Sequence, residues 1–217
     1  MTTLSPNRRT VLWFTFQLVL RVFFSSWIRL RVRGRENLPR VGGALLLMNH
    51  QSFLDPLLVG AILTRPVIYL ARHNLFGGPI AGRLFKYMYV IPINQDAAAA
   101  SSLRLAIERM TQGFLVGIFP EGRRTEDGQM GPFMPGFVAL LKRVSVPVFP
   151  VGIAGAYNAM PRSSWWIRPV AARVVIGEPI SPDALKSTDR GRELVEDARQ
   201  RVLEAFQQAE RWRTGGA

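Results

Sequence analysis

The sequence contains no cysteine, which excludes disulfide bonds, thiolate nucleophiles and cysteine-ligated metals. This absence is consistent with the reducing, cytoplasmic side of a membrane. Histidine is also scarce, because the chain has only His50 and His73. His73 lies in a polar segment between Arg72 and Asn74, which favours a surface position. His50 is therefore the histidine to consider for acid–base chemistry.

Acidic residues are few, at 15 against 28 lysines and arginines, and the formal net charge is +13. Residues 1–40 carry eight arginines and a single acid, Glu36. Positive charge of this kind suits anionic lipid, nucleic acid or an acidic protein. The arginines surround an apolar segment and no aromatic stacking motif accompanies them, so nucleic acid is the least supported partner. We expect membrane lipids as binding partners of the protein, and no nucleic acid.

The longest apolar segment covers residues 11–28 and is barely long enough to span a bilayer. Its polar positions, Gln17, Arg21, Ser25 and Arg29, recur every four residues and form one stripe of a helix. Basic residues flank both ends, whereas a simple span has an asymmetric distribution of lysine and arginine. The pattern favours a helix or helix pair lying in the cytoplasmic leaflet, with a spanning helix and a core helix as alternatives.

The chain is long enough for one well-buried domain, with 217 residues of which 48% are hydrophobic. We expect residues 1–33 to form a membrane-associating segment and residues 34–217 the main domain. Apolar strands are predicted to alternate with helices, which indicates an α/β fold with a largely parallel central sheet and helices on both faces. The predicted strands cover residues 44–48, 66–71, 89–93, 114–119, 146–153 and 171–176. The first predicted helix follows the segment NHQSFLD and runs to about residue 63. The other predicted helices cover residues 74–87, 101–112 (capped by Ser101 or Ser102), 136–143 and 193–211.

His50 follows the predicted strand at 44–48, and Asp55 stands five positions later in the segment NHQSFLD. A helix that begins between them would bring the carboxylate back to the imidazole, fixing its tautomer and stabilising its charged form. Such a base can activate the hydroxyl of an acceptor directly, without a serine or cysteine nucleophile. Spacing alone is a weak signal, and the alternative is a histidine that caps a helix or satisfies the core.

A second polar segment, FPEGRRT, follows the predicted strand at 114–119. Gly122 permits a tight turn, and Arg123 and Arg124 with neighbouring backbone N–H groups suit a phosphate. The alternative is a solvated basic turn. A third segment, VPVFPVGI at 146–153, indicates a buried strand edged by prolines and carries no chemistry by itself.

Together the three segments resemble the glycerolipid acyltransferase family, the group that contains bacterial 1-acylglycerol-3-phosphate acyltransferases (lysophosphatidate acyltransferases). NHQSFLD is similar to its H-x-x-x-x-D block, FPEGRRT to its F-P-E-G-T-R-S block and VPVFPVGI to its proline-edged block. The resemblance implies acyl transfer from acyl-CoA or acyl carrier protein to the sn-2 hydroxyl of 1-acylglycerol-3-phosphate at a membrane surface, with no metal and no cofactor. It implies catalytic roles for His50 and Asp55, and substrate binding by Glu121, Gly122, Arg123, Arg124 and Thr125, with Glu121 organising the loop.

Two positions depart from the family pattern. Gln95 and Met134 stand where the family often has an arginine and a lysine. Another lysolipid therefore remains an alternative acceptor, with Arg123 as a compensating cation. A catalytically silent membrane-surface protein is a further alternative, against which the intact His50 and Asp55 argue. The amides of residues 49–52 or of the Gly122 turn are the expected donors to an oxyanion.

Overall fold

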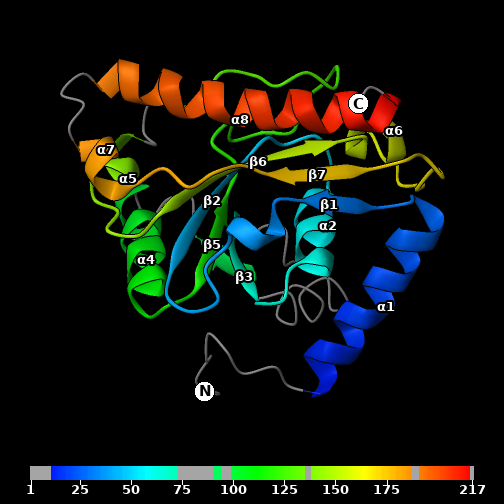
Figure 1. The fold of residues 1–217 in the computed structure, drawn as a ribbon, viewed down its shortest axis with the longest axis horizontal. Helices are drawn as coiled ribbons and strands as arrows, with labels where there is room; N and C mark the ends of the chain where they lie inside the picture. Colours follow the sequence, from blue (N-terminus) through cyan, green and yellow to red (C-terminus); the bar gives the residue numbers. More distant parts are fainter. Residues whose placement is uncertain (1–10, 73–89, 94–98, 135–137, 187–190, 216–217) are drawn as a thin grey trace.

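The computed structural model describes residues 11–72, 90–93, 99–134, 138–186 and 191–215, and these residues build one central sheet between two layers of helices (Figure 1). The strands are β1 (Arg31–Arg33), β2 (Ala44–Met48), β3 (Val67–Arg72), β4 (Val90–Ile93), β5 (Leu115–Ile118), β6 (Val148–Ala154) and β7 (Arg173–Ile176). The helices are α1 (Val11–Trp27), η1 (Arg35–Asn37), α2 (Asp55–Ile62), α4 (Ala99–Thr111), α5 (Val138–Leu141), α6 (Ala156–Ala159), α7 (Pro182–Lys186) and α8 (Gly191–Thr214).

The described strands lie in the order β1-β7-β6-β2-β5-β3-β4. Neighbouring strands are parallel except for β6 and β7, which pair in antiparallel fashion with Val151 opposite Ile176. The predicted α/β architecture with a largely parallel sheet is confirmed. Because β2, β5 and β6 run in the same direction, their carboxyl ends share one edge of the sheet, and the segments that follow these strands meet there.

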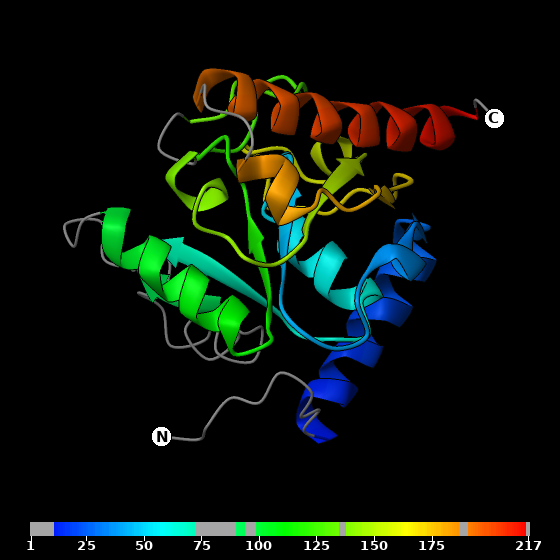
Figure 2. The ribbon, with the colours of Figure 1, turned by 60° about the vertical axis from the view of Figure 1, so that its left-hand side comes forward.

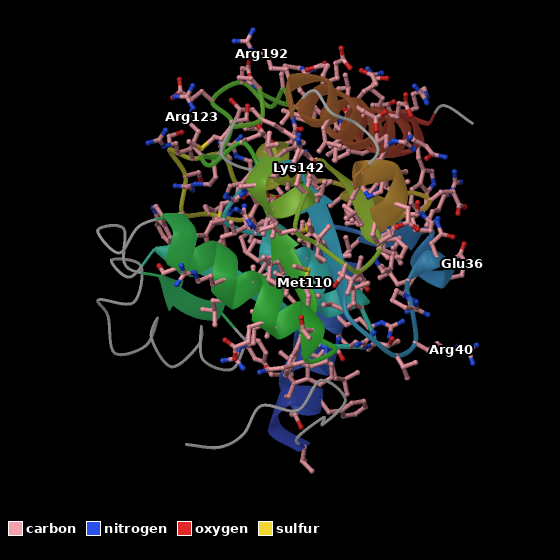
Figure 3. All side chains as sticks on the ribbon, turned by 90° about the vertical axis from the view of Figure 1, so that its left-hand side faces the viewer. Glu36, Arg40, Met110, Arg123, Lys142 and Arg192 are labelled. Atoms are coloured by element: carbon pink, nitrogen blue, oxygen red, sulfur yellow. The ribbon has the colours of Figure 1, made fainter. Side chains whose placement is uncertain are left out.

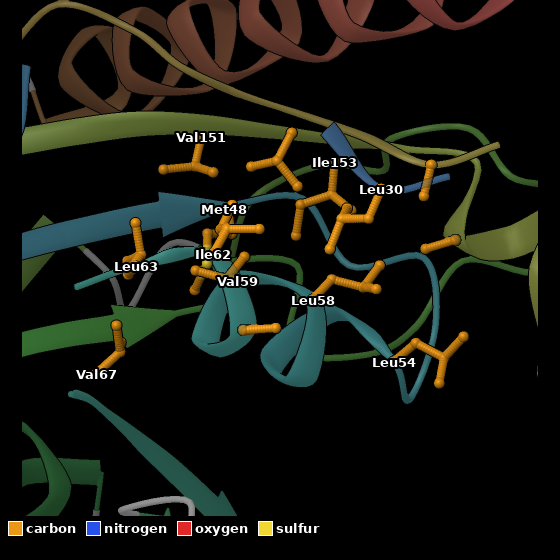
Figure 4. Close-up of a cluster of buried hydrophobic side chains, with 14 of the residues drawn as sticks. Leu30, Met48, Leu54, Leu58, Val59, Ile62, Leu63, Val67, Val151 and Ile153 are labelled. Carbon is orange, nitrogen blue, oxygen red and sulfur yellow. The ribbon is translucent and has the colours of Figure 1, made fainter. Parts of the chain in front are cut away.

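Strand β2 is the centre of the sheet because its sequence, ALLLM, is apolar at every position and fully buried. Alternate side chains point to opposite faces. Leu46 and Met48 join a cluster that includes α1 and α2. Leu45 and Leu47 join the cluster formed with α4, α5 and α8. Figure 4 shows the first cluster, with Met48 beneath Val151 and against Val59 of α2.

Helix α8 lies across one face of the sheet, as Figures 1 and 2 both show. Its buried residues recur every three or four positions and are Leu194, Ala198, Val202, Ala205, Phe206 and Ala209. Gly152 of β6 permits the close approach, since a side chain there would collide with the backbone of Ala205. The predicted amphipathic helix at 193–211 is thus an outer helix whose apolar side completes the core.

Helix α1 packs on α2 rather than standing apart from the domain. Phe24 and Ile28 are buried in the cluster with α2, and the Gln17 amide donates hydrogen bonds to the carbonyls of Gly60 and Leu63. The opposite side of α1 exposes apolar side chains: Val11, Phe14, Leu18, Val19, Val22, Phe23 and Trp27. No helix in the described part of the chain is both long and apolar enough to cross a membrane.

The predicted strands match the observed ones to within a few residues. The predicted helix at 101–112 is α4, but α4 begins at Ala99, so the prediction that Ser101 or Ser102 caps it is wrong. The helix predicted at 136–143 is reduced to α5 among the described residues. The helix predicted at 74–87 and His73 lie outside the described residues. The short elements η1, α6 and α7 were not predicted, because runs of three to five residues carry too little periodicity.

Candidate active site

His50 and Asp55 lie together at the carboxyl end of β2. The imidazole Nδ1 of His50 is 2.7 Å from Asp55 Oδ2. Since a carboxylate only accepts hydrogen bonds, Nδ1 carries the proton and Nε2 is left with a free lone pair. Asp55 is fully buried, whereas the His50 side chain retains 20% exposure. The pair therefore presents a base at the surface with a shielded carboxylate behind it.

The turn that joins the two residues is organised by one oxygen of Asp55. The backbone amides of Gln51 and Ser52 donate to the same Oδ2 atom at 2.7 and 2.8 Å. Asp55 is also the first residue of α2, where a negative charge is favoured by the helix dipole. The H-x-x-x-x-D spacing thus places the histidine before a helix and the carboxylate at its first position, close enough to meet.

Two aromatic rings lie behind the imidazole. Phe119 stacks on His50 with ring centroids 4.0 Å apart, and Tyr69 stacks on the Phe119 ring at 6.3 Å. The Tyr69 hydroxyl and Asp55 Oδ1 are buried and have no hydrogen-bond partner among the described residues. Burial, and secondarily the charge of Asp55, raises the pKa of Tyr69, which therefore remains a neutral phenol. The rings fix the imidazole plane and keep one of its faces dry.

Glu121 ties the FPEGRRT segment to the catalytic turn. Its Oε1 accepts a hydrogen bond from the His50 amide at 2.7 Å, and its Oε2 accepts one from the Gly131 amide at 2.8 Å. Burial raises the pKa of Glu121, and these two amides offset part of that increase. Glu121 is 8% exposed, and because both of its carboxylate oxygens accept backbone amides, it holds two loops together.

The loop that follows Glu121 surrounds an open groove. Gly122 has a left-handed backbone (φ 69°), and a side chain there would meet the sulfur of Met134. The Thr125 amide donates to the His50 carbonyl at 2.8 Å, which fixes the loop beside the imidazole. The groove has a volume of about 980 Å³ and is lined by residues 121–127 and 129–134.

Arg123 and Arg124 line this groove, and neither guanidinium forms an ion pair or hydrogen bond with another described residue. Arg123 is exposed and projects from the surface (Figure 3). The neighbouring acids are engaged elsewhere: Glu126 pairs with Arg162, and Asp127 accepts a hydrogen bond from the Thr125 hydroxyl at 2.8 Å. The groove therefore contains two cations without an acidic partner among the described residues.

The expected oxyanion donors are mostly engaged within the protein. The amides of His50, Gln51 and Ser52 donate to carboxylates, and the Gly122 amide donates to the Phe119 carbonyl at 3.0 Å. The amides of His50, Gln51 and Ser52 hold Asp55 and Glu121, and that of Gly122 closes its own turn, so these four do not face an oxyanion. The amides of Arg123 and Arg124, in the same loop, donate no hydrogen bond to the described residues.

Several contacts that support the site had no signal in the sequence. The Asn49 side chain exchanges two hydrogen bonds with the backbone of Ile153, at 2.9 and 2.7 Å. The Gln51 side-chain amide donates to the Gly128 carbonyl at 2.9 Å, and the Tyr157 hydroxyl donates to the Glu126 carbonyl at 2.9 Å. These contacts join segments about 30 to 100 residues apart, which local patterns do not reveal. Asn49 and Gln51 stand in the NHQSFLD segment and Phe119 in the FPEGRRT segment, so the sequence marks these positions but not their partners.

Of the two departures from the family pattern, Gln95 lies outside the described residues. Met134 is 57% exposed and its amide donates to the Pro120 carbonyl at 2.9 Å. Its thioether occupies the space above Gly122. The position therefore contributes an apolar wall to the groove in place of a cation.

With this geometry in hand, comparison with known proteins places the chain in a family. The sequence model of the family named Acyltransferase matches residues 29–154, more than half of the chain. These residues contain β2, the His50–Asp55 turn, the Glu121 loop and β6. The chain belongs to the acyltransferase family.

Relatives of this chain include 1-acyl-sn-glycerol-3-phosphate acyltransferases. The chain is 27% identical over 189 residues to the 1-acyl-sn-glycerol-3-phosphate acyltransferase of Bacillus subtilis, covering 85% of this chain and 92% of that protein. It is 30% identical over 179 residues to the chloroplastic 1-acyl-sn-glycerol-3-phosphate acyltransferase LPAT1 of Arabidopsis thaliana, covering 81% of this chain. The chain spans about half the length of LPAT1 and of the similar Brassica napus protein (50% and 51%).

A solved structure shares the fold. The crystal structure of the 1-acyl-sn-glycerophosphate acyltransferase PlsC from Thermotoga maritima superposes with a TM-score of 0.75 and 26% sequence identity. The match covers 90% of this chain and 80% of that chain. The likeness therefore extends over nearly the whole chain and includes the sheet that positions His50.

Proposed function

We propose that this protein transfers a fatty acyl group from an acyl thioester to the sn-2 hydroxyl of 1-acylglycerol-3-phosphate, giving phosphatidate. The observation that carries the proposal is the contact of 2.7 Å between His50 Nδ1 and Asp55 Oδ2, which leaves Nε2 free. This base lies beside a groove with two uncommitted arginines. Membership of the acyltransferase family and the names of its relatives support the same activity.

In the proposed reaction His50 Nε2 removes the proton from the acceptor hydroxyl as its oxygen attacks the thioester carbonyl. A C–O bond forms, and the carbonyl oxygen carries the negative charge of the tetrahedral intermediate. The C–S bond then breaks, and the departing sulfur receives the proton from the imidazolium. Asp55 stabilises the imidazolium between the two steps, because its buried carboxylate remains bonded to Nδ1.

The acceptor phosphate is proposed to bind in the groove beside Glu121. Arg123 and Arg124 supply charge, and the free amides of the same loop supply directional donors. Thr125 and Glu121 hold this loop against the His50 backbone, so the phosphate site and the base keep a fixed separation. Gly122 contributes the left-handed turn that this geometry requires.

The donor is an acyl thioester of CoA or of acyl carrier protein, and no cofactor is proposed. The exposed apolar side of α1 and the positive charge of the N-terminal region support association with the cytoplasmic face of the cell membrane. The membrane would supply the lysolipid and receive the product. A different lysolipid is a second candidate acceptor, favoured by the apolar wall that Met134 adds to the groove.

The proposal is tested by an acyl-transfer assay on the purified full chain, with both donor types and a panel of lysolipids. Product formation is followed by mass spectrometry. We expect 1-acylglycerol-3-phosphate to give the highest kcat/KM. A higher kcat/KM for a lysolipid with a phosphodiester head group would show that this lysolipid is the acceptor instead. Absence of transfer to every lysolipid would overturn the proposed function.

A further inference from the structure

The segment between α6 and β7 exposes two adjacent indoles. Trp165 and Trp166 are 87% and 60% exposed, and their rings meet edge to face at 6.1 Å. The backbone around them is well held: the Trp166 amide donates to Ser164 Oγ at 3.1 Å, and the Arg168 amide donates to the Ala159 carbonyl at 2.8 Å. An ordered turn thus presents two large apolar rings to solvent, which marks an interaction surface.

A third exposed indole belongs to the same surface. Trp27, the last residue of α1, is 42% exposed, and its Nε1 donates to the Ile167 carbonyl at 2.9 Å. Figures 1 and 2 both show the segment before β7 beside the end of α1. Trp27, Trp165 and Trp166 are called the tryptophan rim below. Trp27 belongs both to the rim and to the exposed apolar side of α1, and so links the two.

The charges around the rim are almost all positive. Arg29, Arg31, Arg162 and Arg168 are exposed, and residues 11–33 and 159–173 contain no acid. Arg162 is 3.4 Å from Glu126 and is the one of these four with an acidic partner among the described residues. Indoles beside guanidinium groups match the head-group layer of an anionic bilayer, where tryptophan spans the polar and apolar regions and arginine binds phosphate.

A bilayer accounts for this surface better than other partners do. An acidic protein or a nucleic acid would engage the arginines and rings, but neither accounts for the aliphatic side chains that α1 exposes along its length, such as Val11, Leu18 and Val19. The hydrocarbon region of a membrane accepts all of these. The occupant that fits the whole surface is therefore the anionic leaflet of a membrane.

The rim is attached directly to the candidate active site. Ser52, in the His50–Asp55 turn, donates from Oγ to the carbonyl of Met160, where the segment carrying the tryptophans begins. Arg162 of this segment reaches Glu126 of the groove loop. A bilayer in contact with the rim would lie at the sheet edge that carries His50.

We propose that Trp165 and Trp166 of the tryptophan rim form a second bilayer-contacting element, beside α1 and its Trp27, that inserts into the head-group layer of an anionic leaflet. Two separate contacts fix the tilt of a protein on a membrane, whereas a protein bound through one helix can still rotate about the axis of that helix. The rim thereby directs the candidate site toward lipid. Only this orientation of the candidate site toward lipid rests on the proposed function, and the contact of the rim with a bilayer does not. The rim segment lies outside residues 29–154, so the family match does not account for it.

The first test measures binding of the full chain to vesicles of phosphatidylcholine with phosphatidylglycerol by flotation. The double variant Trp165→Ala, Trp166→Ala should bind at least ~10-fold more weakly, because each indole removes a large apolar area from water. Val41→Ala is the matched control. Val41 is 71% exposed but precedes β2, at the opposite edge of the sheet from His50, and its removal should leave binding unchanged.

The second test uses fluorescence quenching by brominated phospholipids in the same vesicles. One variant keeps only Trp165 and Trp166, with Trp13, Trp27 and Trp212 changed to phenylalanine. The other keeps only Trp212, which packs beneath Arg33 and Arg173. We expect quenching in the first variant and none in the second. Circular dichroism verifies that both are folded.

Undiminished vesicle binding by the double alanine variant would overturn the proposal, as would absence of quenching for Trp165 and Trp166. Either result is the one expected if a protein or nucleic acid covers the rim. Neither measurement requires acyl transfer, so a chain that proves inactive on every lysolipid still tests the rim. Conversely, an active chain whose rim stays in water would retain the proposed function and lose this inference.

Discussion

Asp55 holds the candidate catalytic turn through one carboxylate oxygen. Oδ2 accepts from His50 Nδ1 and from the amides of Gln51 and Ser52, all within 2.8 Å. The carboxylate is fully buried, so at Oδ2 these three hydrogen-bond donors of the described chain take the place of water. The residue thus acts on both the shape of the turn and the tautomer of the imidazole.

Asp55→Asn should lower kcat by roughly 10²–10⁴, because an amide no longer stabilises the imidazolium or reliably fixes the proton on Nδ1. The variant keeps an oxygen for the backbone amides and is expected to fold. Steady-state kinetics and circular dichroism measure the two properties. Asp183→Asn, at an exposed position in α7, is the matched control. Wild-type turnover in a folded Asp55→Asn protein would contradict the assigned role.

Arg124→Ala should reduce kcat/KM for 1-acylglycerol-3-phosphate by about 10²-fold, since charge-assisted hydrogen bonds to a phosphate dianion are lost. The loss should be smaller for acceptors whose phosphate is a diester. Arg192→Ala, which removes an exposed arginine from the start of α8, should have no effect. If Arg124→Ala slows all acceptors equally, this arginine does not read the head group.

Among the elements, those with long apolar runs were predictable and the connections between them were not. The run at 44–48 identifies β2 as a fully buried strand, and the alternation of strands and helices indicates the parallel sheet. The sequence also identifies His50, Asp55 and the Glu121 loop. It does not show that Glu121 accepts from the His50 amide, or that Tyr157 supports Glu126, because both contacts depend on strand order.

Glu121 gives a pH-dependent prediction for the loop it anchors. Because burial raises its pKa in the folded chain, its stabilising contribution is largest below the unfolded value of about 4.3 and falls as pH rises through the higher folded value. Glu121→Gln does not titrate and has a pH-independent loss of one hydrogen bond. The advantage of the wild type over Glu121→Gln in free energy of unfolding should therefore decrease as pH rises above the unfolded value of about 4.3. Denaturant titrations at several pH values measure it, and an advantage that grows with pH would contradict the assignment.

Helix α1 has two sides whose substitutions should separate stability from membrane binding. Phe24 is 1% exposed, so Phe24→Ala should lower the free energy of unfolding by about 3–5 kcal/mol. Phe14 is 52% exposed, so Phe14→Ala should change it by less than about 0.5 kcal/mol and instead weaken vesicle binding. Thermal denaturation and flotation distinguish the two. A large destabilisation by Phe14→Ala would show that this side of α1 packs on protein.

At the scale of the whole molecule, the parallel strands bring the functional features to one edge. The His50–Asp55 turn follows β2, the Glu121 loop follows β5, and the segment with Trp165 and Trp166 comes after β6 and α6. The described helices lie on both faces of the sheet (Figure 1). The candidate base and the tryptophan rim proposed to contact a membrane therefore lie at the same edge of the sheet.

The most direct test of the account is acyl transfer by His50→Ala, measured with acyl-CoA and 1-acylglycerol-3-phosphate as thiol release and phosphatidate formation. We expect a fall in kcat of about 10²–10⁴ or more, since the base is removed, while the melting temperature stays close to that of the wild type. Phosphatidate formation at near wild-type rates by the folded His50→Ala protein would contradict it.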